Sequence, residues 1–253
     1  MAPIDTLVHD GIHELRLARP PVNALDPALC RALPEAIARS VADGAAGLVL
    51  AGGPKVFSAG LDVPYLLSIQ DDPAALRAAW ETFFEAARAL AACPVPVAAA
   101  IAGHAPAGGC VLALCCDLRI MASGPFAIGL NETQVGLALP VGILRLLQRT
   151  VGQREAERLA VSGAMVEAER ALAIGLVDEL AGIDEVTTRA LAHLQALAGL
   201  PRAPMLATRA LARADLVDAL SPAAIDLDRM LESWRSPDTQ AALHALVARL
   251  GKG

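Results

Sequence analysis

Hydrophobic and polar positions follow two different patterns along this chain of 253 residues. In the first two-thirds, short apolar runs typical of strands alternate with segments in which apolar residues recur at helical spacing. Beyond Pro140 the helical spacing dominates. This order predicts an α/β core followed by a helical region.

The strands are predicted from short apolar runs bounded by turn residues. They are expected at residues 4–8, 12–17, 47–51 and 95–101. Asp10-Gly11 lies between the first two runs and predicts a hairpin turn.

The first helix is predicted to begin at Asp26-Pro27, which supplies an N-cap and a first-turn proline. Pro34 lies seven positions further on, inside the same pattern, and is expected to kink or shorten this helix. Later helices are predicted at 73–92, 141–151, 154–161, 166–174 and 184–197, with three further segments up to residue 250.

The stretch between Arg88 and Asp117 contains no charged residue and is long enough to span a bilayer. Three prolines and three glycines within it would break a single helix and leave backbone groups unpaired in lipid. We therefore predict a buried strand, a glycine loop and a short buried helix through Cys116, and no membrane segment.

A break in the helical pattern at 199–201 divides the predicted domains. Residues 1–199 are expected to form the core, and residues 200–253 a C-terminal helical region.

Composition narrows the possible functions. The net charge of -6 and the pI of about 5.4 lack the basic footprint of a nucleic-acid-binding protein. The five cysteines show neither disulfide-framework spacing nor a CxxC pair, which favours reduced thiols. The first residues match neither a signal peptide nor a transit peptide, so we expect a cytoplasmic protein.

Three glycines, Gly60, Gly108 and Gly109, occur in two separate apolar loops. Each loop taken alone is typical of a tight turn or of close packing. Brought together, the two loops can direct backbone N–H groups at one oxygen, which is the arrangement of an oxyanion hole.

Five segments carry a resemblance to a known family. They are RPPVNAL at 19–25, FSAGLD at 57–62, PAGGC at 106–110, CDLRI at 116–120 and GLNETQ at 129–134. Their residues and their order resemble the crotonase (enoyl-CoA hydratase/isomerase) superfamily over essentially the whole chain. Within it, the chain is most similar to the mitochondrial-type Δ3,Δ2-enoyl-CoA isomerases.

The resemblance implies a crotonase-like ββα spiral core with a C-terminal helical oligomerisation region, assembled as a homotrimer or hexamer. It also implies an acyl-CoA thioester as substrate, with the backbone N–H groups of Leu61 and Gly108 forming the oxyanion hole. The residues implied to bind substrate or coenzyme A are Ala59, Gly60, Leu61, Asp62, Val63 and Gly108.

Glu132 is the implied catalytic residue. Hydratases of the family use two glutamates, but this chain has Val111 at the first position and keeps only Glu132 at the second. One carboxylate suffices to move a proton from C2 to C4 of a 3-enoyl-CoA, which gives the trans-2-enoyl-CoA of fatty-acid β-oxidation. This chemistry implies no metal and no redox cofactor, since coenzyme A is part of the substrate.

Alternative interpretations stay open from the sequence. The chain is also compatible with an enoyl-CoA hydratase, another crotonase-type acyl-CoA enzyme or a noncatalytic acyl-CoA-binding scaffold. Without its motif, Glu132 would be interpreted as an ordinary surface or salt-bridged acid.

Other prominent side chains are given structural interpretations. The aromatic residues Trp80, Phe83 and Phe84 are interpreted as core or interface residues. We expect structural hydrogen bonds or ion pairs from Asn23, Asp117 and Arg119, and only weak evidence for a ligand contact at His104. Arg19 and Lys55 are candidates for the coenzyme A phosphates but are not assigned to the site.

Overall fold

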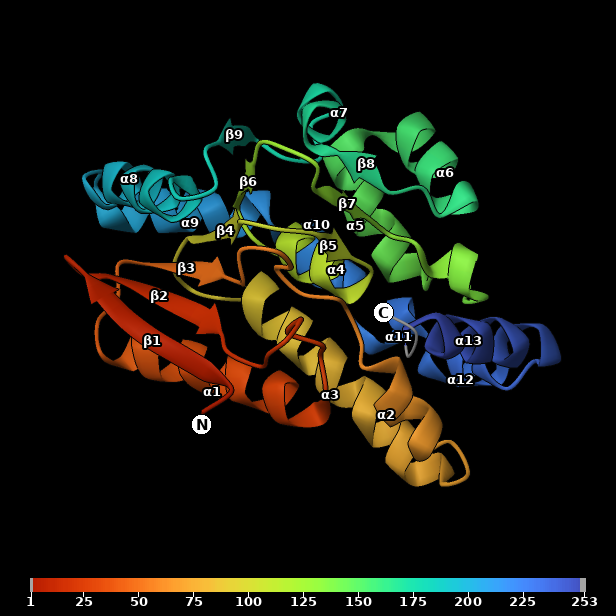
Figure 1. Cartoon of the computed structure of the whole chain (residues 1–253). Coiled ribbons are helices and arrows are strands. Elements are labelled where there is room, and N and C mark those ends of the chain that lie inside the picture. Colours follow the sequence, from red (N-terminus) through yellow and green to blue (C-terminus); the bar gives the residue numbers. More distant parts are fainter. Residues whose placement is uncertain (1, 251–253) are drawn as a thin grey trace.

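A six-stranded sheet forms the centre of the computed structural model, which describes residues 2–250 (Figure 1). Its order is β1-β2-β3-β4-β6-β9, in which β1 and β2 are antiparallel and every other neighbouring pair is parallel. The strands are β1 (Ile4–His9), β2 (Ile12–Leu17), β3 (Gly47–Ala51), β4 (Val97–Ile101), β6 (Leu118–Ala122) and β9 (Glu179–Ala181).

A smaller sheet of order β5-β7-β8 lies beside the first. Its strands are β5 (Ala105–Pro106), β7 (Ala127–Gly129) and β8 (Val166–Glu167). The chain leaves β5 into the second glycine loop and leaves β7 into the segment that carries Glu132, and these two strands are paired in parallel. This sheet therefore brings the two segments together.

The central sheet is covered by helices on both faces, which explains the wholly apolar sequences of β3 and β4. Alternate residues face opposite sides: Leu48 and Leu50 belong to the large core, whereas Val49 packs with residues of α8. Helices α1 and α3 contribute to the large core, and α8 packs against the other face.

The helices follow the chain in three groups. Before the fifth strand they are α1 (Pro27–Ala42), α2 (Val63–Ser68) and α3 (Pro73–Ala91). The middle group is α4 (Gly108–Leu114), the 3-10 helix η1 (Glu132–Val135), α5 (Val141–Val151), α6 (Gln153–Ser162), α7 (Ala168–Ala173) and α8 (Val186–Ala198). The last are α9 (Arg202–Ala212), α10 (Ala214–Ala219), α11 (Pro222–Ile225), α12 (Leu227–Trp234) and α13 (Pro237–Leu250).

Local signals in the N-terminal part are confirmed. Asp10 and Gly11 both have positive φ, at 47° and 82°, and form the turn between β1 and β2. Asp26 caps α1 by accepting a hydrogen bond from Leu29 N at 2.8 Å. Of the expected kink or shortening at Pro34, the shortening is wrong, because α1 spans 16 residues through the proline and its apolar face is buried on either side of it, whereas the kink stays a prediction. That burial offsets the lost backbone hydrogen bond.

The expected helix over 166–174 begins too early, because Val166 and Glu167 form strand β8. Strands β5, β6, β7 and β9 and helix α2 were not predicted, and five helices follow residue 200 in the described part of the chain, rather than three. The missed strands have only two to five residues, so they present too little of a pattern to separate them from loops.

The uncharged stretch after Arg88 forms the end of α3, then β4, a glycine loop and α4, as predicted. Its helix ends at Leu114 rather than continuing through Cys116. Within residues 2–250, none of the helices has the length and apolar character needed to cross a membrane.

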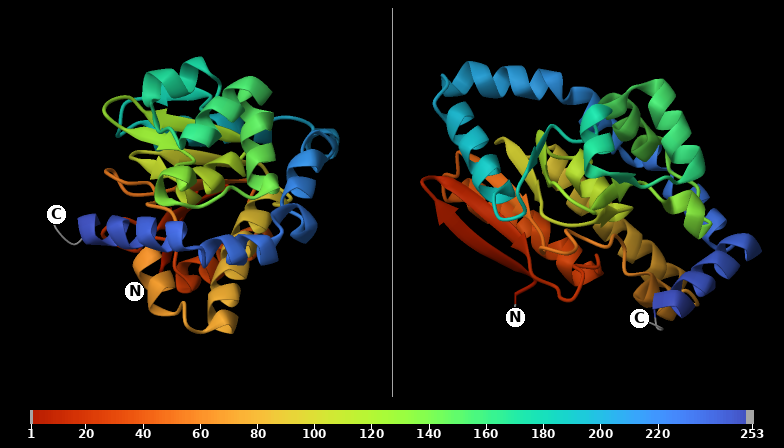
Figure 2. Two further views of the ribbon diagram at one scale, coloured as in Figure 1. Left: turned by 90° about the vertical axis from the view of Figure 1, so that its right-hand side faces the viewer. Right: turned by 45° about the horizontal axis from the view of Figure 1, so that its top comes forward.

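The break at 199–201 separates α8 from α9. The division into two domains there stays a prediction. Arg209 of α9 donates to Asp117 at 2.7 and 2.8 Å and to Cys93 O at 2.7 Å, which anchors this helix on the core. Figure 2 shows α12 and α13 on the side of the molecule that also carries α2 and α3.

Candidate active site

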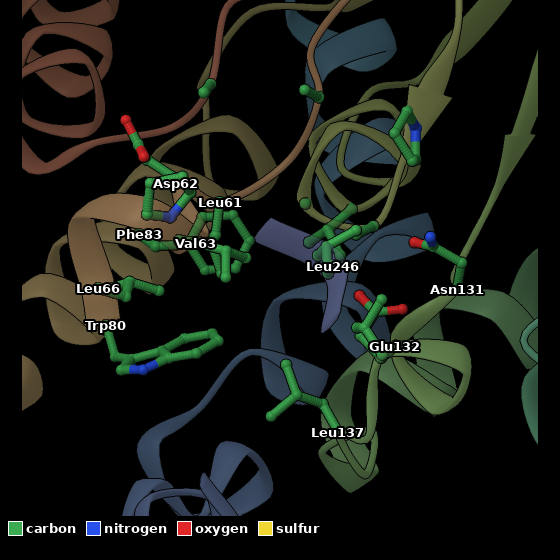
Figure 3. Close-up of a pocket in the computed structure, with 18 of the residues that line it drawn as sticks. Leu61, Asp62, Val63, Leu66, Trp80, Phe83, Asn131, Glu132, Leu137 and Leu246 are labelled. Atoms are coloured by element: carbon green, nitrogen blue, oxygen red, sulfur yellow. The ribbon is translucent and has the colours of Figure 1, made fainter. Parts of the chain in front are cut away.

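A cavity of about 680 Å³ lies between the two glycine loops, η1, α3 and the C-terminal helices (Figure 3). Of the predicted site residues it is lined by Ala59, Leu61, Asp62, Val63, Gly108 and Glu132. The remaining one, Gly60, is buried directly behind the lining. The structure therefore gathers residues from positions 59 to 132 around one space.

The two glycine loops touch through their backbones. Gly60 has φ +79°, and a Cβ at this position would lie 3.0 Å from Gly108 N. A Cβ on Gly109 would lie 2.4 Å from Ser58 O. The buried Ser58 hydroxyl fixes the first loop by donating to Asn23 O at 2.7 Å. Both loops thus require glycine for close approach, and Gly60 also requires it for its left-handed backbone conformation.

The N–H groups of Leu61 and Gly108 have no acceptor within residues 2–250, although the backbone on either side of Leu61 is hydrogen-bonded. Gly60 O accepts from Leu25 N at 2.8 Å, and Asp62 N donates to Leu25 O at 3.2 Å. Gly108 opens α4, where helix geometry leaves its N–H unsatisfied. Both donors therefore remain available to an oxygen in the cavity.

Strained backbone precedes the second donor. Ala107 has φ 46° and ψ -120°, a conformation that residues with a side chain rarely adopt. Its own N–H is held by Gly129 O at 2.8 Å, which ties the loop to the segment before Glu132. The strain orients Gly108 at the start of α4.

Glu132 is the first residue of η1, and Figure 3 shows its carboxylate directed into the cavity. The segment is fixed by Thr133, whose Oγ1 donates to Ala160 O at 2.8 Å, and by Gly136 in a left-handed conformation. The residue as a whole is partly exposed, but its Oε2 is buried and has no hydrogen-bond partner in the described part of the chain. Burial raises the pKa of Glu132 from 4.5 to about 7.

The surroundings of Glu132 offer no compensating charge. Val111 lines the same cavity and is 2% exposed. Arg19 is the one basic side chain among the lining residues that the structure describes, and it is paired with Asp26 at 3.0 Å and Asp62 at 2.6 Å. Glu132 is therefore poised to exchange a proton near neutral pH.

The neighbouring Cys110 is fully buried. Burial, with a smaller contribution from the nearby Glu132 charge, raises the pKa of its thiol well above the usual range. Cys110 is thus a protonated, apolar neighbour rather than a nucleophile.

Asp62 has a structural role at the cavity rim. It caps α2 by accepting from Tyr65 N at 3.0 Å and binds Arg19 at the same time. Asp62 and Pro64 are an N-cap and first-turn signal for α2 that the sequence analysis did not use.

The structural interpretations of several polar side chains are confirmed. Asn23 accepts from Arg19 N at 2.9 Å and donates to Phe57 O at 3.1 Å, and His104 Nδ1 accepts from Ala127 N at 3.0 Å. Arg119 donates to Leu176 O at 3.0 Å and pairs with Asp178 at 2.8 Å. Lys55 is exposed and lies outside the cavity lining.

The aromatic residues of α3 need a correction. Trp80, Phe83 and Phe84 are buried as expected, but all three also line the cavity. Further lining residues were not predicted from the sequence, namely Asn131, Leu137, Ile143, Met230, Trp234 and Leu246. Amphipathic spacing identifies the buried face of a helix, but only the tertiary structure decides which part of that face borders a cavity.

Helix α13 closes the cavity on the side of Glu132. Thr239 Oγ1 donates to Gly136 O at 2.5 Å, and a Cβ at Gly136 would lie 2.9 Å from Ala242 Cβ. Further along this helix, Leu246 lines the cavity. Within residues 2–250, no group of three His, Cys, Asp or Glu side chains is arranged to bind a metal ion.

Comparison with known proteins places this geometry in a family. The sequence model of the enoyl-CoA hydratase/isomerase family matches residues 8–247. The chain is 31% identical to the mouse mitochondrial enoyl-CoA delta isomerase 1 over 244 residues, which cover 95% of this chain and 84% of that protein. It is 35% identical over 215 residues to a probable enoyl-CoA hydratase, echA17, of Mycobacterium avium, with 82% of each chain covered.

The fold comparison agrees. The crystal structure of human mitochondrial delta3-delta2-enoyl-CoA isomerase superimposes with a TM-score of 0.92 at 29% identity, covering 99% of this chain and 98% of that one. The predicted crotonase-like fold class is thereby confirmed.

Proposed function

The chain belongs to the enoyl-CoA hydratase/isomerase family, and from this premise we propose that it is a Δ3,Δ2-enoyl-CoA isomerase. One observation carries the proposal: Glu132 is the single unpaired carboxylate among the described lining residues, and Val111 occupies the position of a second acid. The proposed reaction converts a 3-enoyl-CoA into the trans-2-enoyl-CoA.

The first step is proton removal from C2 by the ionised Glu132. The C2–H electron pair moves into the C2–C1 bond, and negative charge develops on the thioester oxygen. The free N–H groups of Leu61 and Gly108 stabilise this charge. Because their backbones are fixed by loop contacts, little reorganisation is needed when the charge forms.

The second step returns the proton. Glu132, now protonated, donates it to C4, the C3–C4 double bond becomes C2–C3, and the thioester carbonyl re-forms. A pKa of about 7 suits both steps, since the same group must accept and release a proton within one turnover. The steps use no metal or redox cofactor, and coenzyme A enters as part of the substrate.

Hydration is the second candidate function, because a relative with 35% identity is named a probable enoyl-CoA hydratase. Syn addition of water requires a group that orients the water opposite Glu132. Val111 offers only methyl groups there, which supports isomerisation over hydration. A noncatalytic acyl-CoA-binding scaffold would bind ligand without turnover.

The decisive experiment incubates the purified protein with 3-enoyl-CoAs and follows 2-enoyl-CoA and 3-hydroxyacyl-CoA separately by chromatography. We expect double-bond migration without hydration. Glu132→Gln should lower kcat by about 10³-fold or more while acyl-CoA binding persists. The matched control is Glu157→Gln, which neutralises an exposed acid and should leave kcat unchanged. Hydration alone, or full activity of Glu132→Gln, would refute the proposal.

We also propose that the protein assembles as a homotrimer or hexamer. Exposed apolar side chains occur near and on α9 and α10, at Leu200 (49%), Leu211 (81%) and Val217 (40%). A second copy of the chain would remove them from water. Light scattering of the purified protein tests this, and replacing Leu211 with Asp should shift the mass toward monomer.

A further inference from the structure

The side of the cavity facing away from Glu132 is an aromatic wall, defined here as Trp80, Phe84 and Trp234. Figure 3 shows the Trp80 ring across the open space from the Glu132 carboxylate. The three residues are only 5%, 2% and 1% exposed, although all of them line the cavity. Little of their surface is accessible to solvent, whereas Pro21 and Pro64 at another part of the lining are exposed.

The aromatic wall is rigidly packed. Trp80 stacks on Phe84 with ring centroids 6.2 Å apart and meets Trp234 edge to face at 5.8 Å and 77°. Behind it, Arg77 of α3 pairs with Asp228 of α12, and Arg88 donates to Leu220 O at 3.4 Å. Two helices from distant parts of the chain thus hold the rings in place.

We propose that the aromatic wall is the closed end of the acyl-binding part of the cavity and selects acyl-CoAs with tails of medium length. The inference rests on the proposed function for the placement of the reacting carbons beside Glu132. Carbons beyond C4 then extend toward Trp80, past Leu61, Val63 and Leu137. A tail that fills this space gains affinity with each methylene, and a longer one meets the rings.

The size of the cavity fits this substrate class. A space of about 680 Å³ lies within the usual range for sites that enclose a small organic ligand. It must hold the thioester and the adjoining part of the pantetheine arm as well as the tail. Each buried methylene strengthens binding about fourfold until the wall is reached.

The wall contains its own spectroscopic probe. The chain has two tryptophans, Trp80 and Trp234, and both belong to the aromatic wall. Intrinsic tryptophan fluorescence of the unmodified protein therefore reports whether a ligand reaches this end.

The first test titrates the protein with free coenzyme A and with saturated acyl-CoAs of 4, 8, 12 and 16 carbons, following tryptophan emission and heat of binding together. We expect free coenzyme A and the shortest tail to bind without changing the emission, and the medium tails to change it. Emission that responds to free coenzyme A as strongly as to the medium tails would overturn the proposal, because the pantetheine arm would then occupy this end.

The second test enlarges the closed end of the cavity by replacing Trp80 with smaller side chains. Trp80→Ala should bind the 16-carbon acyl-CoA at least about tenfold more tightly relative to the 8-carbon one, since room is created at the closed end. Trp80→Phe should show a smaller change in the same direction. The ratio of two affinities in one preparation does not depend on the folded fraction, so partial destabilisation leaves the result interpretable.

Phe126→Ala is the matched control, since this ring packs on His104 outside the cavity lining. It should leave the length preference unchanged. An unchanged ratio in both Trp80 variants would refute the wall as a length limit. Saturated acyl-CoAs cannot be isomerised, so these binding results stand even if the protein fails to move double bonds, and the two proposals fail separately.

Discussion

Asp117 and Glu132 are two shielded carboxylates that the fold treats in opposite ways. Asp117 accepts from Val97 N at 2.8 Å and pairs with Arg209 at 2.7 Å and Arg213 at 3.1 Å. Glu132 has a buried Oε2 with no hydrogen-bond partner among residues 2–250. The first acid is surrounded by donors that link separate elements, whereas the second lacks them, which is the setting expected of an acid that exchanges protons.

The largest effect should follow from removing the Asp117 carboxylate, which lowers the free energy of unfolding. Asp117→Ala leaves Arg213, which is 7% exposed, without its carboxylate and frees the Val97 N–H. Removing one partner of a buried ion pair typically costs about 3–5 kcal/mol. Urea unfolding should show this loss, while kcat per folded molecule stays near the wild-type value. A loss below about 1 kcal/mol would mean that Asp117 is no more important than an exposed acid.

The pH dependence of the reaction should show the raised pKa of Glu132. Because burial raises the pKa of Glu132 to about 7 and the base must be ionised, kcat/KM should fall about tenfold per pH unit below that value. A profile of initial rates from pH 5 to pH 9 measures this. An acid limb centred near 4.5 would show that Glu132 is solvated like an ordinary glutamate.

Replacing Glu132 should raise the free energy of unfolding at high pH, whereas replacing Asp117 should lower it. The folded protein binds the Glu132 proton more tightly than the unfolded chain, so the stability that this group contributes is fully present below pH 4.5 and is lost as the pH rises through 7. Glu132→Gln removes this decrease. Above pH 7 the variant should be more stable, by on the order of 2 kcal/mol after allowance for partial exposure. Unfolding curves at pH 5 and pH 8 give the comparison, and equal losses at both pH values would contradict it.

The smallest effect is expected from giving Glu132 a hydrogen-bond donor, such as Asp117 already has. Val111→Thr places one hydroxyl donor in the lining near Glu132, which should stabilise the carboxylate and move the acid limb down by less than about one pH unit. Val49→Thr, buried at 0% exposure in the central sheet, controls for the cost of a buried hydroxyl. If the acid limb of the pH–rate profile has the same midpoint in the two variants, residue 111 does not influence the pKa of Glu132.

The sequence predicted the structural features that depend on local signals. Asp26, the Asp10-Gly11 turn and the glycine loops carry their structural meaning within a few residues. The structural interpretation of Asp117 followed from the cost of burying an unpaired charge. The identity of its partner, Arg209, could not be predicted, because that residue lies 92 positions away in the chain.

The aromatic wall shows why the remainder could not be predicted. Trp80 has the apolar spacing of a core residue, and nothing within α3 distinguishes a ring that faces a cavity from one that faces a neighbouring helix. Its contact with Trp234 depends on how α12 packs against α3. Strands as short as β8 exist only through their partners, since two residues cannot form a recognisable pattern.

The contact between α13 and the Glu132 segment has a consequence for the order in which a working site forms during translation. The hydrogen bond from Thr239 to Gly136 joins residues 103 positions apart. A ribosome needs about 5 to 20 seconds to add that much chain. Until α13 emerges, the Glu132 segment lacks this contact, and Leu246 is missing from the cavity lining. The cavity therefore takes its described shape only after α12 and α13 have been made.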